Sequence, residues 1–142
     1  MPAILYPSPL AQGLPAAILG HLPAILAAAQ GEYDAWEQDD GGFDEKVGVG
    51  GICQEIADAI GGVLSRAGFD AITVDNQGVG EQHVWLLAAL PDGIYSIDIP
   101  ARVYERGGGY VWKKTPGVVF QPEHLVVSLT NDDPDSLDQY RD

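Results

Sequence analysis

The stretch that decides the fold is residues 51–67, which read GICQEIADAIGGVLSRA. Its apolar residues recur every three or four positions, and this spacing predicts an amphipathic helix over 52–67 with one buried face. Gly68 directly after it is a typical C-terminal stop. Gly61 and Gly62 each cost roughly 1 kcal/mol relative to alanine inside a helix, but they allow another backbone to approach closely.

A cysteine stands at the start of this helix, after a glycine-rich segment. Cys53 is the one cysteine of the 142 residues, so the chain forms no internal disulfide and a reducing compartment fits it. A thiol attacks a carbonyl well only as the thiolate, which an adjacent histidine and the unpaired N–H groups of a helix start both favour. The same N–H groups can hold an oxyanion. Cys53 is therefore a candidate nucleophile; the alternative is an inert, buried cysteine.

Helices are predicted before this stretch and a sheet after it. Proline residues begin two expected helices, over 14–20 and 22–37. Strands are expected over 71–74, 82–90, 94–99, 110–113, 118–120 and 124–129, and a last helical turn over 133–140. The strand over 82–90 is apolar on both faces, which places it in the centre of the sheet. Helices followed by an antiparallel sheet predict an α+β fold.

The length of the chain predicts one domain over residues 1–142. We expect a helical N-terminal part with an acidic loop over 1–46, a core over 47–130 and an acidic C-terminal turn over 131–142. The core contains the residues that carry chemistry.

A histidine and an aspartate lie on a predicted hairpin after the helix. His83 opens the central strand and Asp98 lies on the returning one, where a carboxylate can orient an imidazole and stabilise its charged form. A two-residue loop, Pro91-Asp92, makes the pair diagonal neighbours, and a four-residue loop over 89–92 puts them directly opposite. A three-residue loop without a bulge puts them on opposite faces. The alternatives are a structural histidine and a surface or capping acid.

Three short motifs follow one another in the order Cys, His, Asp. They read Gly51-x-Cys53-x-x-x-Ala57, His83-x-Trp85 and Gly93-x-Tyr95-x-x-Asp98-x-Pro100, and they span about residues 48–100. The set resembles the transglutaminase-like branch of the papain-like cysteine enzymes. The resemblance implies N-terminal helices packed on an antiparallel sheet, with Cys53 as nucleophile, His83 as base and then acid, and Asp98 as orienter. It also implies amide chemistry by way of a thioester: peptide hydrolysis, glutamine deamidation or transamidation.

The chain departs from the family pattern in two ways. The stretch between the cysteine and the histidine is short, and no side chain is assigned to the oxyanion. Gln54, Gln77 and Gln82 are candidates for that role, and Gly51 and Trp85 are further candidates for contacts with the substrate. For Trp85, a core position is favoured over a role as a substrate platform.

Composition limits the partners. The net charge is −14 with a pI near 4.2, and residues 32–45 hold seven acids and no basic residue. Nucleic acid and anionic membranes are therefore not expected partners, whereas a basic protein or peptide fits. The apolar stretch 14–29 is short, is interrupted by prolines and lacks a basic leader. We therefore expect neither a membrane span nor a secretory signal, and we expect a cytoplasmic location.

No metal or cofactor is expected. The acids over 34–44 do not match the twelve-residue calcium loop, and close Cys/His ligand pairs for zinc are absent. The glycines at 107–109 precede a strand rather than a helix, unlike a phosphate loop. Two other functions stay open: an acidic binding or regulatory protein that keeps the fold without catalysis, and a structural component that uses its proline-rich arm. The oligomeric state is also open.

Overall fold

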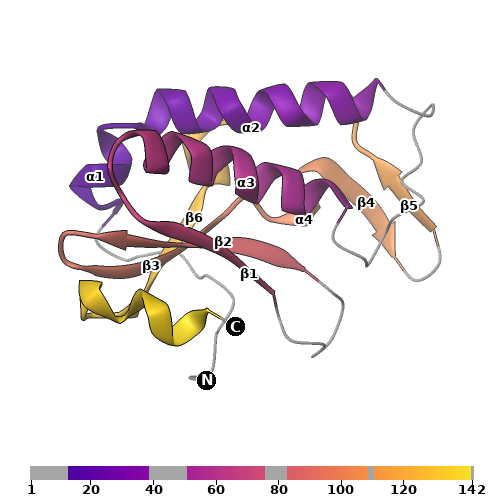
Figure 1. Cartoon of the computed structure of the whole chain (residues 1–142). Coiled ribbons are helices and arrows are strands. Elements are labelled where there is room, and N and C mark those ends of the chain that lie inside the picture. The colour runs from indigo at the N-terminus through magenta and orange to yellow at the C-terminus, as the bar shows by residue number, and fades with distance from the viewer. Residues whose placement is uncertain (1–12, 39–50, 76–82, 109–110, 142) are drawn as a thin grey trace.

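The computed structural model describes residues 13–38, 51–75, 83–108 and 111–141 (Figure 1). Its elements in chain order are α1 (Ala16–Leu19), α2 (Leu22–Glu37), α3 (Gly51–Arg66), β1 (Ala71–Asp75), β2 (Val84–Leu90), β3 (Gly93–Asp98), α4 (Ala101–Tyr104), β4 (Glu105–Gly108), β5 (Val111–Lys114), the 3-10 helix η1 (Pro122–His124), β6 (Val126–Asn131) and the 3-10 helix η2 (Pro134–Tyr140). The predicted α+β class is confirmed.

The main sheet has four antiparallel strands in the order β1-β2-β3-β6. The predicted central strand, β2, does lie inside it. In the hairpin of β2 and β3, Leu90 pairs with Gly93, so the loop is the two-residue Pro91-Asp92. Strands β4 and β5 form a separate two-stranded sheet.

Helices α2 and α3 lie side by side over one face of the sheet, and η2 covers the other face (Figure 1). The alternation along β2 serves both layers, because Leu86 and Leu90 join the core under the helices while Trp85 and Leu87 join the core under η2. This explains why the strand is apolar on both faces. From α3, one stripe enters the first core; it consists of Ile52, Ile56, Ile60, Val63 and Leu64.

The structure corrects the predicted strand over 118–120. That segment forms no strand, because its backbone groups bond to side chains of α2 rather than to a neighbouring strand. Gln30 Nε2 donates to the Val118 carbonyl at 2.9 Å, and Gln30 Oε1 accepts from the Phe120 N–H at 2.7 Å. The Tyr33 hydroxyl accepts from the Val118 N–H at 3.1 Å.

Two more sequence expectations need correction. The last strand begins at Val126 rather than at 124, because residues 122–124 form η1, whose turn is closed by His124 Nδ1 accepting from the Gln121 N–H at 2.9 Å. Elements α4 and β4 were not predicted. No helix in the described ranges is long and apolar enough to cross a membrane.

Candidate active site

Cys53 is the third residue of α3, in the first turn of the helix. The first four N–H groups of a helix have no partner within it, so backbone donors gather around this position. The cysteine is 8% exposed and packs against Ala57 of the next turn and Val84 of β2. The apolar stripe of α3 fixes this placement, because burying the stripe sets the helix against the start of β2.

His83 and Asp98 are hydrogen-bonded across the hairpin. With the two-residue loop, the register that pairs Leu86 with Ile97 makes them diagonal neighbours. The His83 Nε2 and Asp98 Oδ2 atoms are 2.7 Å apart. The side chain of Asp98 is 1% exposed and that of His83 is 17% exposed. A carboxylate this deeply buried requires a strong partner, and the imidazole supplies one.

The electrostatics of His83 bring Cys53 into the same group. Burial by itself would lower the pKa of His83, but hydrogen bonds to Asp98 and Cys53, together with the charges of both residues, raise this pKa to about 10. The imidazole is therefore protonated at neutral pH. The structure thus joins His83 to Asp98 by a hydrogen bond, and Cys53 interacts electrostatically with the same imidazole.

The other predicted contacts have different outcomes. Trp85 is 1% exposed, packs in the core under η2 and stacks on the His83 ring with centroids 6.1 Å apart, so it is not a substrate surface. Gln54 Nε2 donates to the Asp58 carboxylate, one turn further along α3, at 3.3 and 3.4 Å. In this structure the Gln54 amide therefore bonds to Asp58. Gly51 is the first residue of α3. Gln77 and Gln82 lie outside the described residues, as does the acidic segment from 39 to 45.

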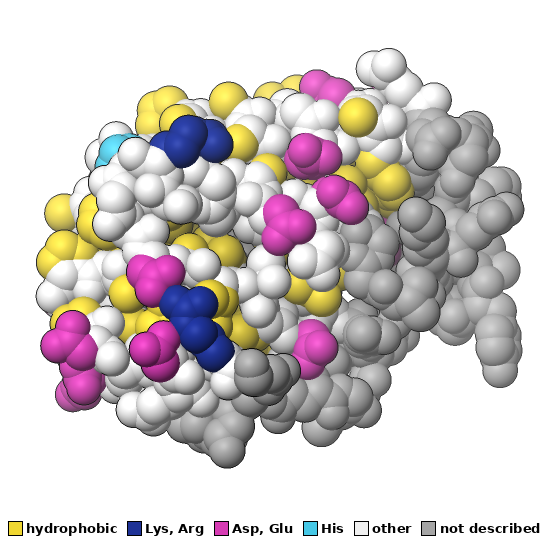
Figure 2. Space-filling model, viewed as in Figure 1, with side chains coloured by type: hydrophobic (Ala, Val, Ile, Leu, Met, Phe, Trp, Pro, Cys, Tyr) yellow, Lys and Arg dark blue, Asp and Glu magenta, His cyan; other side chains and the backbone are white. Residues whose placement is uncertain are grey.

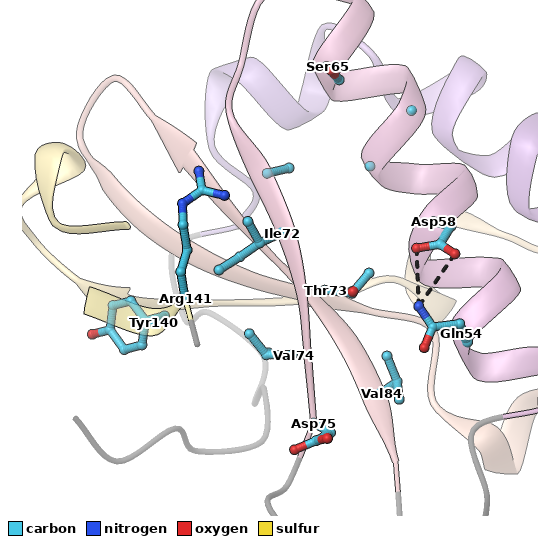
Figure 3. A pocket seen from close by; sticks show the side chains of 13 residues that line it. Gln54, Asp58, Ser65, Ile72, Thr73, Val74, Asp75, Val84, Tyr140 and Arg141 are labelled. Atoms are coloured by element: carbon cyan, nitrogen blue, oxygen red, sulfur yellow. Dashed lines mark hydrogen bonds between the residues drawn. The ribbon is translucent and has the colours of Figure 1, made fainter. Parts of the chain in front are cut away.

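A groove of about 780 Å³ runs between α3 and the β1 edge of the sheet (Figure 3). Gln54 and Asp58 of α3 line it on one side of β1, and Tyr140 and Arg141 lie on the other side. Cys53 does not line the groove itself, but its neighbours Gln54 and Val84 do. The groove therefore ends beside the residues that pack around the cysteine.

The sequence analysis did not identify this groove. The signal was present in α3 as a second stripe of polar and small residues at helical spacing, opposite the apolar one. It consists of Gln54, Asp58, Gly61, Gly62 and Ser65. The two glycines were noted as sites of close approach, but which surface they face depends on the packing of α3 against β1 and β2.

Comparisons of the chain with protein-family models, with curated proteins and with solved structures gave no match. Among the described residues, no group of three or more His, Cys, Asp and Glu side chains could hold a metal ion. The resemblance to the transglutaminase-like enzymes therefore rests on the motifs alone.

Proposed function

We propose that the protein is a cysteine-dependent amide hydrolase or acyl transferase of the transglutaminase-like kind. The observation that carries this proposal is the position of His83, whose imidazole interacts with the buried carboxylate of Asp98 and with Cys53. A protonated imidazole beside a cysteine favours the thiolate, which is the nucleophilic form. The amide could be a peptide bond or a glutamine side chain.

The first half of the reaction uses the charged pair. The Cys53 thiolate attacks the amide carbon, and the oxyanion that forms accepts hydrogen bonds from N–H groups in the first turn of α3. The C–N bond then breaks, and the leaving nitrogen takes the proton of the His83 imidazolium. This leaves a thioester on Cys53 and a neutral imidazole.

The second half restores the enzyme. Water or an amine attacks the thioester carbon while His83 removes its proton. The C–S bond breaks, Cys53 leaves as the thiolate, and the products are an acid or a new amide. Asp98 keeps the imidazole in one orientation and stabilises its charge in both halves. His83 is a general acid and then a base, and it ends protonated as it began.

The test is the rate at which iodoacetamide alkylates the native protein between about pH 5 and 10. Because the chain has a single cysteine, intact mass reports Cys53 alone. We expect reaction that persists well below pH 8 and that slows or moves to higher pH in His83→Ala. The matched control is His124→Ala, which removes a histidine from η1 and should leave the profile unchanged. Circular dichroism verifies that each variant is folded.

A second experiment tests whether the reactive Cys53 catalyses amide chemistry. A peptide library incubated with the protein is examined by mass spectrometry for bond cleavage and for conversion of glutamine to glutamate, with Cys53→Ala as the control. Activity that depends on Cys53 supports the proposal. A profile that follows an ordinary thiol and is unaffected by His83→Ala would overturn it.

A non-catalytic binding protein is the second candidate. The observation in its favour is the burial of Cys53, which is 8% exposed and packed against apolar neighbours. Under this interpretation Cys53 reacts only when the protein unfolds, so its alkylation rate rises with urea and is insensitive to His83.

A further inference from the structure

The groove beside α3 is bordered by an edge strand. In the order β1-β2-β3-β6, strand β1 pairs with β2 on one side, and no strand within the described residues pairs with its outer side. An edge strand presents alternate backbone N–H and C=O groups to its outer side, where an extended chain can bond to them. All five residues of β1 line the groove, and four of them are partly or fully exposed.

The helical wall of the groove is made of small and polar residues. The stripe of α3 that faces it contains Gly61 and Gly62 in its middle and short or polar side chains on either side. A Cβ atom at Gly61 would meet Leu86 Cδ1 of β2 at 3.0 Å, so α3 packs directly on the sheet there, and one at Gly62 would meet the flexible Arg66 guanidinium at 3.2 Å. The volume of about 780 Å³ is within the roughly 300–1,000 Å³ that is usual for ligand sites.

The end of the groove near Cys53 is acidic. Asp58 and Asp75 line it and are exposed. The partner of Asp58 is the neutral amide of Gln54, so its negative charge is not neutralised there. Figure 2 shows acidic side chains gathered over α3 and the strand below it. The basic residue that lines the groove, Arg141, lies at the end of the groove next to η2. Its guanidinium forms ion pairs with the carboxylates of Asp70 and Asp138, with N···O distances of 2.7 and 2.6 Å.

We propose that the groove binds an extended polypeptide segment carrying lysine or arginine, added as a strand along β1. Charge complementarity selects this occupant, since the acids at the groove and the net charge of −14 attract basic side chains. The proposal rests on the proposed function and names its substrate class. Asp75 pairs with Val84, and Val84 packs on Cys53, so the Asp75 end of β1 is the end nearer to the cysteine.

The dimensions set the length of the recognised segment. The five residues of β1 span roughly 16 Å at about 3.3 Å per residue. About five residues of the bound segment therefore lie along the strand, and alternate side chains face the α3 wall. A lysine or arginine among those that face α3 lies within reach of Asp58.

Binding is tested with the full chain carrying Cys53→Ala, which prevents turnover. The probe is a fluorescein-labelled peptide of about seven residues in which lysine alternates with threonine, compared with its glutamate counterpart. We expect binding of the lysine peptide only, and Asp58→Lys should weaken it by about tenfold or more. The matched control is Glu55→Lys, an equal charge change at an exposed position of the same helix outside the groove, which should change affinity by less than about twofold.

A backbone scan distinguishes strand addition from attraction by charge alone. Each peptide in the series carries one N-methyl group, which removes one backbone donor. Strand addition predicts loss of binding at every second position, because only alternate N–H groups face β1. Equal tolerance at all positions, equal affinity of Asp58→Lys and Glu55→Lys, or self-association of the protein through β1 that excludes the peptide would overturn the proposal.

The two proposals fail separately. If Cys53 is reactive and His83-dependent but the scan shows no alternation, the docking mode is wrong and the catalytic proposal stands. If the scan alternates but Cys53 behaves as an ordinary buried thiol, β1 binds basic segments without being part of an enzyme, and the assignment of a substrate class is withdrawn.

Discussion

Replacing Asp98 with asparagine is expected to lower the pKa of His83 by about 1–3 units. The substitution keeps the shape of the side chain and removes the charge of a carboxylate that is 1% exposed and 2.7 Å from the imidazole. With the charge centres roughly 4 Å apart and an effective dielectric constant of about 20, the attraction is about 4 kcal/mol, which corresponds to about three pKa units. The His83 pKa should therefore fall from about 10 to between about 7 and 9.

The assay is an NMR titration of the histidine Cε1–H resonances between about pH 5 and 11. The chain has three histidines, so His21 and His124 serve as internal references. Asp92→Asn is the matched control, because this acid lies on the same hairpin but bonds to the Tyr95 hydroxyl at 3.0 Å instead. A His83 pKa that stays within about half a unit of wild type in Asp98→Asn, or that is near 6.5 in the wild type, refutes the reasoning.

The same pair makes stability depend on pH in a definite direction. Because the folded-state pKa of His83 is raised from 6.5 to about 10, its contribution to the free energy of unfolding is complete below pH 6.5 and is lost as the pH rises through 10. The side chain is 17% exposed, and the full contribution is at most about 5 kcal/mol. Urea titrations should show a smaller loss over this window in Asp98→Asn; an equal loss would contradict the assignment to His83.

Three further changes test the packing. Gly93→Ala should destabilise the protein by about 2 kcal/mol or more, because φ is +155° and a Cβ atom would lie 2.6 Å from the Asn131 carbonyl oxygen. The control is Gly68→Ala, where φ is +96° and the space is open, and it should cost only about 1 kcal/mol. Equal costs of the two substitutions would contradict the clash at Gly93. Gln30→Ala removes two of the hydrogen bonds that hold the segment after β5 to α2 and should cost roughly 1–3 kcal/mol in a urea titration, whereas no change would show that water replaces them. Arg141→Ala should leave the midpoint of urea unfolding almost unchanged, since its side chain is 41% exposed and its ion pairs face solvent; a clear loss of stability would indicate that Arg141 packs against η2.

Much of the site could be predicted because it depends on local rules. The spacing of apolar residues in 51–67 gave α3 to within one residue at each end, and it placed Cys53 in the first turn. Because side chains alternate between the two faces of a strand, the sequence predicted that His83 and Asp98 share a face if the hairpin loop has an even number of residues. The sequence did not decide the length of that loop. The pairing of Leu90 with Gly93 shows that it has two residues.

The errors occurred where partners are distant in sequence. Residues 118–120 have the composition of a strand, but the hydrogen bonds of their backbone come from Gln30 and Tyr33, more than eighty positions earlier. For Trp85, the core position that the sequence favoured over a substrate contact is the one observed, because η2 covers that face of the sheet. In both cases the residues alone do not reveal which element lies opposite.

The sequence by itself determined the class of fold, the central strand, the start of α3 and the three residues that meet around His83, because periodicity, strand parity and side-chain chemistry are local properties. Only the tertiary structure decided how strongly the environment raises the pKa of His83 and that a groove with an acidic end runs along β1. The physical reason is that pKa values and grooves arise from burial and from charges on separate elements, and packing of α3 against the sheet brings these together.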